Sequence, residues 1–168
     1  LTLPISSAAL GIILGLNGVA GGAATVGCCC NMLGFAVISY PDNGVGGLVA
    51  QGLGTSMLQV PNLMRKPILW IPPVLTSAIL GPVSTCIFQL RNNGAAISSG
   101  MGTAGLVGPI GIITGWSNMP EGYAVGAFDW LGMILVCFVL PVLLSWAIGK
   151  FMRKKGWIKE GDLKVDLG

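Results

Sequence analysis

The sequence predicts an all-α integral membrane protein: a polytopic helical bundle with four to five spans and one or two glycine-rich re-entrant segments. Its 168 residues are 53% hydrophobic and only 9% charged, with a mean hydropathy of +0.80. A soluble domain carries about 25% charged residues, so this chain has too few charges to cover a water-exposed surface. The charges are also segregated, which leaves long uncharged runs. These runs are 1–41, 43–64, 67–90, 92–120 and 130–149.

The first half of the chain contains two apolar stretches and a third that is shorter and more polar. Residues 1–22 form a first candidate helix, and residues 23–40 form a second one that ends at the turn-forming sequence PDNG. Residues 45–60 are uncharged but contain four glycines and several amide and hydroxyl side chains. A small basic loop with Arg65 and Lys66 follows.

The second half contains the clearest membrane span. Residues 68–90 are apolar and long enough to span, although they contain prolines. Residues 98–116 carry no charge, but six of the nineteen are glycine and one is proline, which makes a continuous helix unfavourable. Residues 130–149 form the cleanest span, with Trp130 and Trp146 near its ends, where interfacial aromatic residues lie.

The distribution of charge predicts the orientation in the membrane. Asp129 precedes the last span, and a basic cluster follows it. The cluster consists of Lys150, Arg153, Lys154, Lys155, Lys159 and Lys164. By the positive-inside rule, residues 1–150 form a transmembrane domain and residues 151–168 form a basic cytoplasmic tail. We expect Arg153, Lys154 and Lys155 to fix this topology and to lie near a cytoplasmic partner.

The same orientation makes residues 98–116 a re-entrant segment. Both flanks of this stretch fall on the outer side when the loops are counted back from the last span. Irregular backbone at membrane depth is tolerated only where protein or a watery cavity surrounds it. We therefore expect this glycine-rich segment to face the interior of the protein.

A weak internal repeat points to the same kind of feature. Asn43-Gly44 precedes GLGTS at residues 52–56, and Asn93-Gly94 precedes GMGTA at residues 100–104. Paired broken segments in the two halves of a chain are typical of transporter binding sites. Coincidence in a glycine-rich sequence is the alternative.

Several chemistries lack the residues that they need. The chain has no histidine, and its five cysteines form no CxxC pair and have no carboxylate nearby. The uncharged runs contain no acid or base for catalysis or proton coupling. The sequence therefore predicts no catalytic residue, no metal site and no cofactor. Its positive charge is too local for a face that binds nucleic acid.

What remains at membrane depth is uncharged polarity. Amide and hydroxyl groups suit a neutral polyhydroxylated solute, because each sugar hydroxyl both donates and accepts a hydrogen bond. The candidate contacts are Asn31, Gln51, Thr55, Ser56 and Thr103. The glycines expected to supply broken backbone beside them are Gly52, Gly54, Gly100 and Gly102. Alternatively, these polar residues only join helices to one another, as small and polar residues commonly do in bilayers.

Distributed motifs over nearly the whole chain resemble one known family. The motifs are LPISSAALGIILGLNGVAGGAATVGCCCNMLGFAVISYPDNGVGGLVAQGLGTSMLQVPN, WIPPVLTSAILGPVST, GMGTAGLVGPIG and FMRKKGWIKEGDLK. They resemble enzyme IIC, the membrane component of the bacterial phosphoenolpyruvate-dependent sugar phosphotransferase system. Within it, they are most similar to the branch that includes perfringolysin-regulator-like proteins.

The resemblance implies a function and partners. It implies a multi-pass sugar permease of the bacterial cytoplasmic membrane, here roughly its C-terminal half, that acts as a homodimer. A partner IIB component would phosphorylate the sugar, so phosphotransferase activity would arise only together with IIB. A membrane-embedded regulator that senses a ligand without transport is the alternative, and a carrier for an anion or an apolar solute is a third, weaker one.

Overall fold

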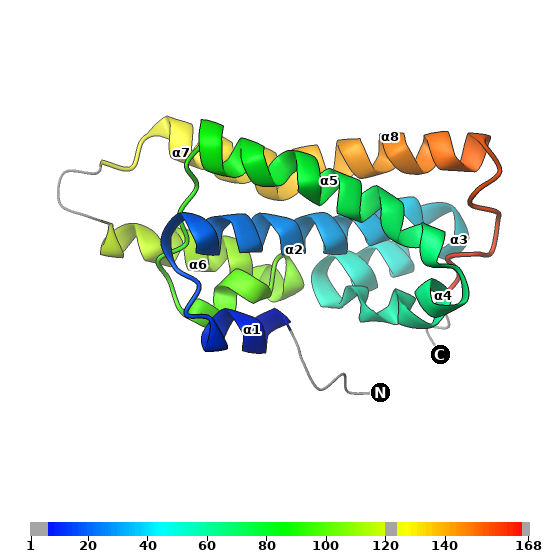
Figure 1. Ribbon diagram of the computed structural model, residues 1–168, viewed down its shortest axis with the longest axis horizontal. Helices are drawn as coiled ribbons and strands as arrows, with labels where there is room; N and C mark the ends of the chain where they lie inside the picture. The colour runs from blue at the N-terminus through cyan, green and yellow to red at the C-terminus, as the bar shows by residue number, and fades with distance from the viewer. Residues whose placement is uncertain (1–6, 120–123, 166–168) are drawn as a thin grey trace.

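The computed structural model describes residues 7–119 and 124–165, and this part of the chain is helical (Figure 1). The α-helices are α1 (Ser7–Ile13), α2 (Gly18–Ile38), α3 (Tyr40–Val49), α4 (Val60–Arg65), α5 (Ile71–Pro82), α6 (Val107–Gly115), α7 (Ala127–Ile134) and α8 (Leu140–Lys154). Three π-helical turns are η1 (Ala50–Gly54), η4 (Val83–Ile87) and η8 (Leu135–Val139). The 3₁₀ turns are η2 (Ser56–Gln59), η3 (Pro67–Trp70), η5 (Ala96–Gly100), η6 (Ala104–Leu106) and η7 (Trp116–Asn118).

The helix α2 forms the centre of the bundle. Figure 1 shows it running along the molecule, with α5 and α8 on one side and with α1, α4 and α6 on the other. Small residues let the neighbouring helices approach closely: a Cβ added at Gly34 would lie 2.9 Å from Ser145 Oγ on α8. Ser145 Oγ also lies 3.0 Å from Thr76 Oγ1 on α5, so one buried contact joins all three helices.

Three continuous helical segments in the described residues are long and apolar enough to cross a membrane. They are Gly18–Ile38, Pro67–Ile87 and Ala127–Lys154. The sequence predicted four to five spans. The difference lies in residues 1–40, where one long helix replaces the two predicted ones, and in residues 45–60, which the structure divides into short helices and turns. The last segment also extends beyond the predicted 130–149 at both ends.

The predicted boundary between residues 22 and 23 is absent, because α2 passes through it without a break. The glycines there serve close packing: a Cβ at Gly22 would lie 1.9 Å from the carbonyl oxygen of Leu90. The chain breaks earlier instead, between α1 and α2. Gly15 and Gly18 there have φ angles of 56° and 60°, which glycine adopts readily.

The first of two helical hairpins consists of residues 40–65. Asn43 near its start and Asn62 near its end both bind the backbone of the C-terminal segment, at Leu163 and Lys164. Both arms therefore begin at the end of the bundle where α8 ends. The tip lies against α2, since a Cβ at Gly52 would meet the side chains of Ala36 and Leu33.

The second hairpin consists of residues 92–118 and enters the bundle from the opposite end. Its base is closed by two 3.3 Å hydrogen bonds, one from each side-chain amide of Asn93 and Asn118 to the backbone carbonyl of the other residue. The backbone N–H of Asn92 also donates to the carbonyl of Gly18, at the start of α2. Its tip contains positive φ angles at Gly102 (55°), Gly105 (52°) and Leu106 (59°), which explains why residues 98–116 cannot form one helix.

The tips of the two hairpins meet beside α2. Thr103 Oγ1 donates a 2.6 Å hydrogen bond to the carbonyl oxygen of Gly52, and both residues are buried. This contact joins the GLGTS and GMGTA sequences that form the weak repeat. The repeat thus corresponds to two broken segments of different local geometry that approach each other from opposite ends of the bundle.

Candidate functional site

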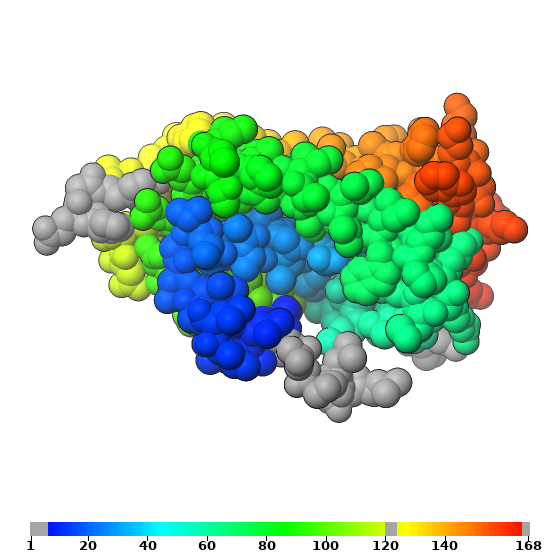
Figure 2. Space-filling model, viewed as in Figure 1, coloured from blue at the N-terminus to red at the C-terminus, as the bar shows by residue number. Residues whose placement is uncertain are grey.

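A cavity of about 510 Å³ opens where the two hairpin tips face α1 and α2. One face of α2 forms its wall, because Cys28, Asn31, Met32 and Phe35 follow the i, i+3, i+4, i+7 spacing of a single helical face. Figure 2 shows the hollow between the blue residues of α1 and the teal residues that follow η1. The other lining residues are Ser7, Ala8, Gly54, Thr55, Ser56, Met57, Val60, Leu63, Trp70, Gly100, Met101 and Ala104.

Asn31 offers an unused acceptor in this wall. Its Nδ2 donates to the carbonyl of Gly27 at 3.2 Å, while its Oδ1 is buried and has no hydrogen-bond partner in the described part of the chain. Most buried polar side-chain atoms in proteins have a partner, so the unpaired oxygen makes Asn31, a residue of the cavity wall, a candidate contact for a ligand donor.

The turn at the tip of the first hairpin presents hydroxyl groups to the cavity. Thr55 is extended, with φ −152° and ψ 134°, between the π turn η1 and the 3₁₀ turn η2. Its N–H donates to Ala50 at 2.8 Å and its Oγ1 accepts from the N–H of Met57 at 3.2 Å. The Thr55 hydroxyl thus keeps its own proton for a further acceptor, and Ser56 lies beside it in the wall.

The opposite side of the cavity is apolar and partly aromatic. Phe35 and Trp70 meet edge to face, with ring centroids 5.9 Å apart and an interplanar angle of 76°. Phe35 is almost fully buried, whereas Trp70 is half exposed. Among the lining residues described, none is Asp, Glu, Lys, Arg or His. The cavity therefore suits a neutral ligand that has both hydroxyl groups and an apolar face.

Two of the five predicted contact residues lie outside this lining. Gln51 is fully buried, and its amide binds Ser39 Oγ at 2.9 Å and Gln59 at 3.0 Å. Thr103 is fully buried and is bound to Gly52. The structure brings Asn31, Thr55 and Ser56 together in the cavity, and it places Gln51 and Thr103 in the frame that holds the hairpin tips.

The four predicted backbone glycines divide in the same way. Gly54 and Gly100 line the cavity, and Gly52 and Gly102 lie behind it. A Cβ at Gly100 would lie 2.0 Å from the carbonyl oxygen of Ser7, and one at Gly102 would lie 2.7 Å from the backbone of Cys28. At Gly52 and Gly54 a Cβ would have ordinary contacts or none. The close approach of backbones therefore requires glycine in the second hairpin rather than in the first.

Sequence reasoning missed the aromatic side of the cavity and its contact with α1. The spacing of Asn31, Met32 and Phe35 along α2 could have indicated the first, because these residues share one helical face. Ser7 gave no signal in the sequence. It reaches the site because its Oγ donates a 2.6 Å hydrogen bond to Gly100, 93 residues away.

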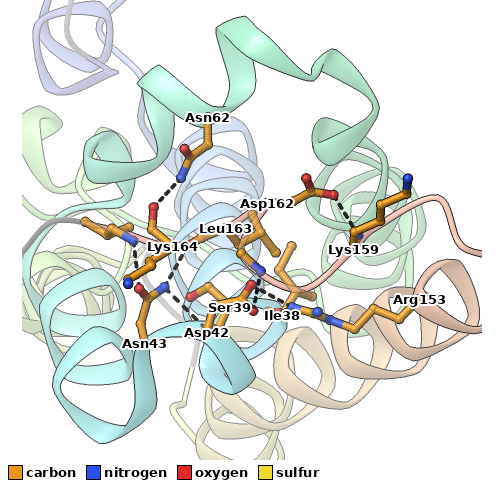
Figure 3. Close-up of polar contacts among 12 residues, drawn as sticks. Ile38, Ser39, Asp42, Asn43, Asn62, Arg153, Lys159, Asp162, Leu163 and Lys164 are labelled. Carbon is orange, nitrogen blue, oxygen red and sulfur yellow. Dashed lines mark hydrogen bonds and ion pairs between the residues drawn. The ribbon is translucent and has the colours of Figure 1, made fainter.

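The predicted basic cluster is only partly free at the surface. Arg153 Nη2 lies 2.9 Å from Asp42 Oδ2, and the side chains are 21% and 3% exposed. Asp42 is the lone charge of the first 64 residues, so this ion pair joins the first hairpin to α8 (Figure 3). Lys154 and Lys155 are exposed beside it. In residues 7–119 and 124–165, no three His, Cys, Asp or Glu side chains are grouped to hold a metal.

In a comparison with protein families, the model described as "Phosphotransferase system, EIIC" matches residues 1–165. Neither the curated proteins nor the solved structures contain a match to the chain. The family match covers nearly the whole chain, including both hairpins and every residue of the cavity wall. The chain therefore belongs to the EIIC family of the phosphotransferase system.

Proposed function

We propose that this chain is the substrate-handling part of a sugar permease, the IIC component of a phosphoenolpyruvate-dependent phosphotransferase system. The observation that carries the proposal is the uncharged cavity at the meeting point of the two hairpin tips, in a chain of the EIIC family. A neutral sugar needs hydroxyl and amide partners and tolerates an apolar surface, and this cavity offers both.

The proposed binding mode assigns each side of the cavity a role. Asn31 Oδ1 accepts a hydrogen bond from a sugar hydroxyl, and Thr55 and Ser56 exchange hydrogen bonds with others. The C–H face of the sugar ring packs on Trp70, which Phe35 supports from the side. Gln51 and Thr103 act indirectly in this proposal, because they hold the turn that carries Thr55.

The proposed membrane arrangement has three spans and two re-entrant hairpins. The two hairpins enter from opposite faces, as expected for an inverted pair of broken segments around a transport site. Arg65 and Lys66 lie at the same end of the bundle as the basic end of α8, since Lys66 contacts Asp162 after α8. The positive-inside rule makes this end cytoplasmic.

Phosphate transfer is assigned to a partner, because the described lining residues include no Asp, Glu, Lys, Arg or His. In this proposal IIB approaches from the cytoplasmic end, near the exposed Lys154 and Lys155, and phosphorylates the bound sugar. A homodimer in the bacterial cytoplasmic membrane remains part of the proposal.

A membrane-embedded regulator is the second candidate, and the motif resemblance to the perfringolysin-regulator-like branch favours it. A regulator would use the same cavity as a sensor, without carrying the ligand across. The two candidates predict the same binding but different transport.

Uptake by membrane vesicles separates them. The full-length protein is tested with labelled neutral sugars, with and without phosphoenolpyruvate and the soluble phosphotransferase components. The permease proposal predicts uptake of one sugar that requires phosphoenolpyruvate and delivers sugar phosphate inside, with Thr55→Val reducing it. Binding of a sugar to folded protein without any uptake would support the regulator instead.

A further inference from the structure

The segment after α8 folds back onto the base of the first hairpin. Its side chains Ile158 and Leu163 are 2% and 0% exposed and belong to an apolar cluster with Phe35 and Leu63. Phe35 and Leu63 are also walls of the cavity. Residues 157–165, here named the tail segment, are therefore packed against the back of the candidate sugar site.

Asparagine side chains fasten the backbone of the tail segment to both arms of the hairpin. Asn43 on the incoming arm donates to the carbonyl of Leu163 at 2.7 Å and accepts from the N–H of Val165 at 2.7 Å. Asn62 on the returning arm donates to the carbonyl of Lys164 at 2.9 Å. Figure 3 shows Asn43 and Asn62 on either side of the tail backbone. The tail segment thus bridges two arms that are 19 residues apart in sequence.

A chain of buried amides continues from the tail segment into the hairpin. Gln59 Nε2 donates to the carbonyl of Leu163 at 2.9 Å and to Gln51 Oε1 at 3.0 Å. Gln51 Nε2 then donates to Ser39 Oγ at 2.9 Å. Gln51, Gln59 and Ser39 are fully buried, so each lost bond would leave a costly unpaired group.

This amide chain encloses the turn that faces the cavity. Gln51 and Gln59 lie on either side of residues 52–58, and their hydrogen bond joins the segments that enter and leave this turn. Thr55 and Ser56 are within it and line the cavity. Removing the Leu163 carbonyl would leave Gln59 without one of its acceptors, at the base of that turn.

Ion pairs outside the apolar cluster hold the same segment. Lys66 Nζ contacts Asp162 Oδ2, and the N–H of Gly161 donates to Asp42 Oδ1 at 3.1 Å. Asp42 is itself paired with Arg153 on α8. These contacts lie at the end of the bundle, where a cytoplasmic partner or a change in ionic conditions could reach them.

We propose that the tail segment is a positioning element for the sugar site, with Gln59 as the positioning residue that links it to Thr55 and Ser56. This inference rests on the proposed role of the cavity in sugar binding. Docking of the tail segment holds the 52–58 turn in its binding geometry, and its release loosens the turn and weakens sugar binding from a distance.

The test uses the full-length protein with a thiol reporter on the turn. Ser56→Cys is combined with Leu163→Ala, which loosens the tail segment, or with Glu160→Ala, a matched control at an exposed tail position. The maleimide reaction rate at residue 56 is obtained by subtracting the rate of the same protein without Ser56→Cys, which reports the native cysteines. The sugar dissociation constant is measured on the Leu163→Ala and Glu160→Ala proteins that keep Ser56.

Leu163→Ala removes a side chain from the apolar cluster and thereby loosens the tail segment, which withdraws the Leu163 carbonyl from Gln59. The proposal predicts that the maleimide rate and the sugar dissociation constant each rise by about tenfold, the factor expected for one lost buried hydrogen bond. Glu160→Ala changes neither.

Equal maleimide rates in Leu163→Ala and wild type would overturn the proposal. If Leu163→Ala does not fold, Asp162→Lys at the surface replaces it, and adding Lys66→Asp should restore the wild-type rate. The maleimide readout does not depend on sugar. Failure of every sugar to bind wild-type protein would therefore remove the sugar assignment and leave the positioning claim to be decided by the labelling rates.

Discussion

Thr103 Oγ1 donates a 2.6 Å hydrogen bond to the carbonyl oxygen of Gly52, and this bond joins the tips of two hairpins that enter the bundle from opposite ends. Gly52 lies in the π turn η1, where the regular helical hydrogen bonds are broken and carbonyl groups become free to accept. A hydroxyl group in one half of the repeat thus provides the hydrogen-bond donor for a backbone carbonyl in the other half.

Replacement of Thr103 tests this junction. Thr103→Val keeps the shape of the side chain but removes the donor, and leaves a buried carbonyl unpaired. We expect the free energy of unfolding to fall by about 1 to 3 kcal/mol. Thermal unfolding of the purified protein measures it. Thr103→Ser keeps the hydroxyl and should lose less, and equal losses in the two variants would contradict a role for the hydrogen bond.

The glycines of the two tips should respond differently to a methyl group. Gly102 has a φ of +55°, and a Cβ there would lie 2.7 Å from backbone of Cys28, so we expect Gly102→Ala to cost about 2 to 5 kcal/mol. Gly54 has no atom within 4 Å of an added Cβ. Gly54→Ala should stay within about 1 kcal/mol of wild type. The yield of monodisperse protein and its unfolding temperature compare the two, and a Gly102→Ala protein as stable as Gly54→Ala would refute the close approach.

Ionisation of the Asp162 carboxyl group should make docking of the tail segment depend on pH. Burial alone raises the pKa of its carboxyl group. The carboxylate also accepts hydrogen bonds from the Lys66 side chain and the Lys159 backbone N–H, and it lies near both positive charges. Together these interactions outweigh burial and hold the pKa below its usual range. Because the folded pKa is lowered, the carboxylate stabilises docking above the ordinary pKa of about 3.9 and loses this effect as the pH falls through the lower folded value.

Maleimide reacts with the thiolate, so its absolute rate falls in acid for every variant and only ratios of rates at one pH are informative. The rate at residue 56 in wild type, relative to that in Asp162→Asn, should rise toward one below about pH 4. Asp162→Asn should have a higher rate than wild type at neutral pH, and the two proteins should converge as the pH falls. A constant ratio of the two rates at all pH values would mean that ionisation of Asp162 does not hold the tail segment.

The sequence predicted the helical membrane class and one of the places at which regular helix fails. Glycine-rich, uncharged residues 98–116 indicated broken backbone, and the structure confirms turns with positive φ at Gly102 and Gly105. The continuous α2 was not predicted, because Gly21 and Gly22 resemble helix breakers in the sequence. The structure shows that they allow close approach of the backbone at residues 90–92. Such close approach arises from tertiary packing, which a local pattern does not contain.

The candidate site was predicted only in part, and tertiary packing is again the reason. Asn31, Thr55 and Ser56 were recognised as uncharged polar groups at membrane depth, and they do line one cavity. The sequence could not separate them from Gln51 and Thr103, which have the same chemistry but find partners within the protein. The basic tail was interpreted from its charges, whereas its docking depends on backbone carbonyls and on the buried side chain of Leu163.

The most direct test of the account is equilibrium binding of a panel of neutral sugars to the full-length protein, compared with Asn31→Ala and with Thr114→Ala as an exposed control outside the cavity. The account predicts that one neutral sugar binds, that Asn31→Ala weakens this binding by about tenfold or more, and that Thr114→Ala leaves it unchanged. Sugar binding that is as tight in Asn31→Ala as in wild type would place the site elsewhere and contradict the central claim.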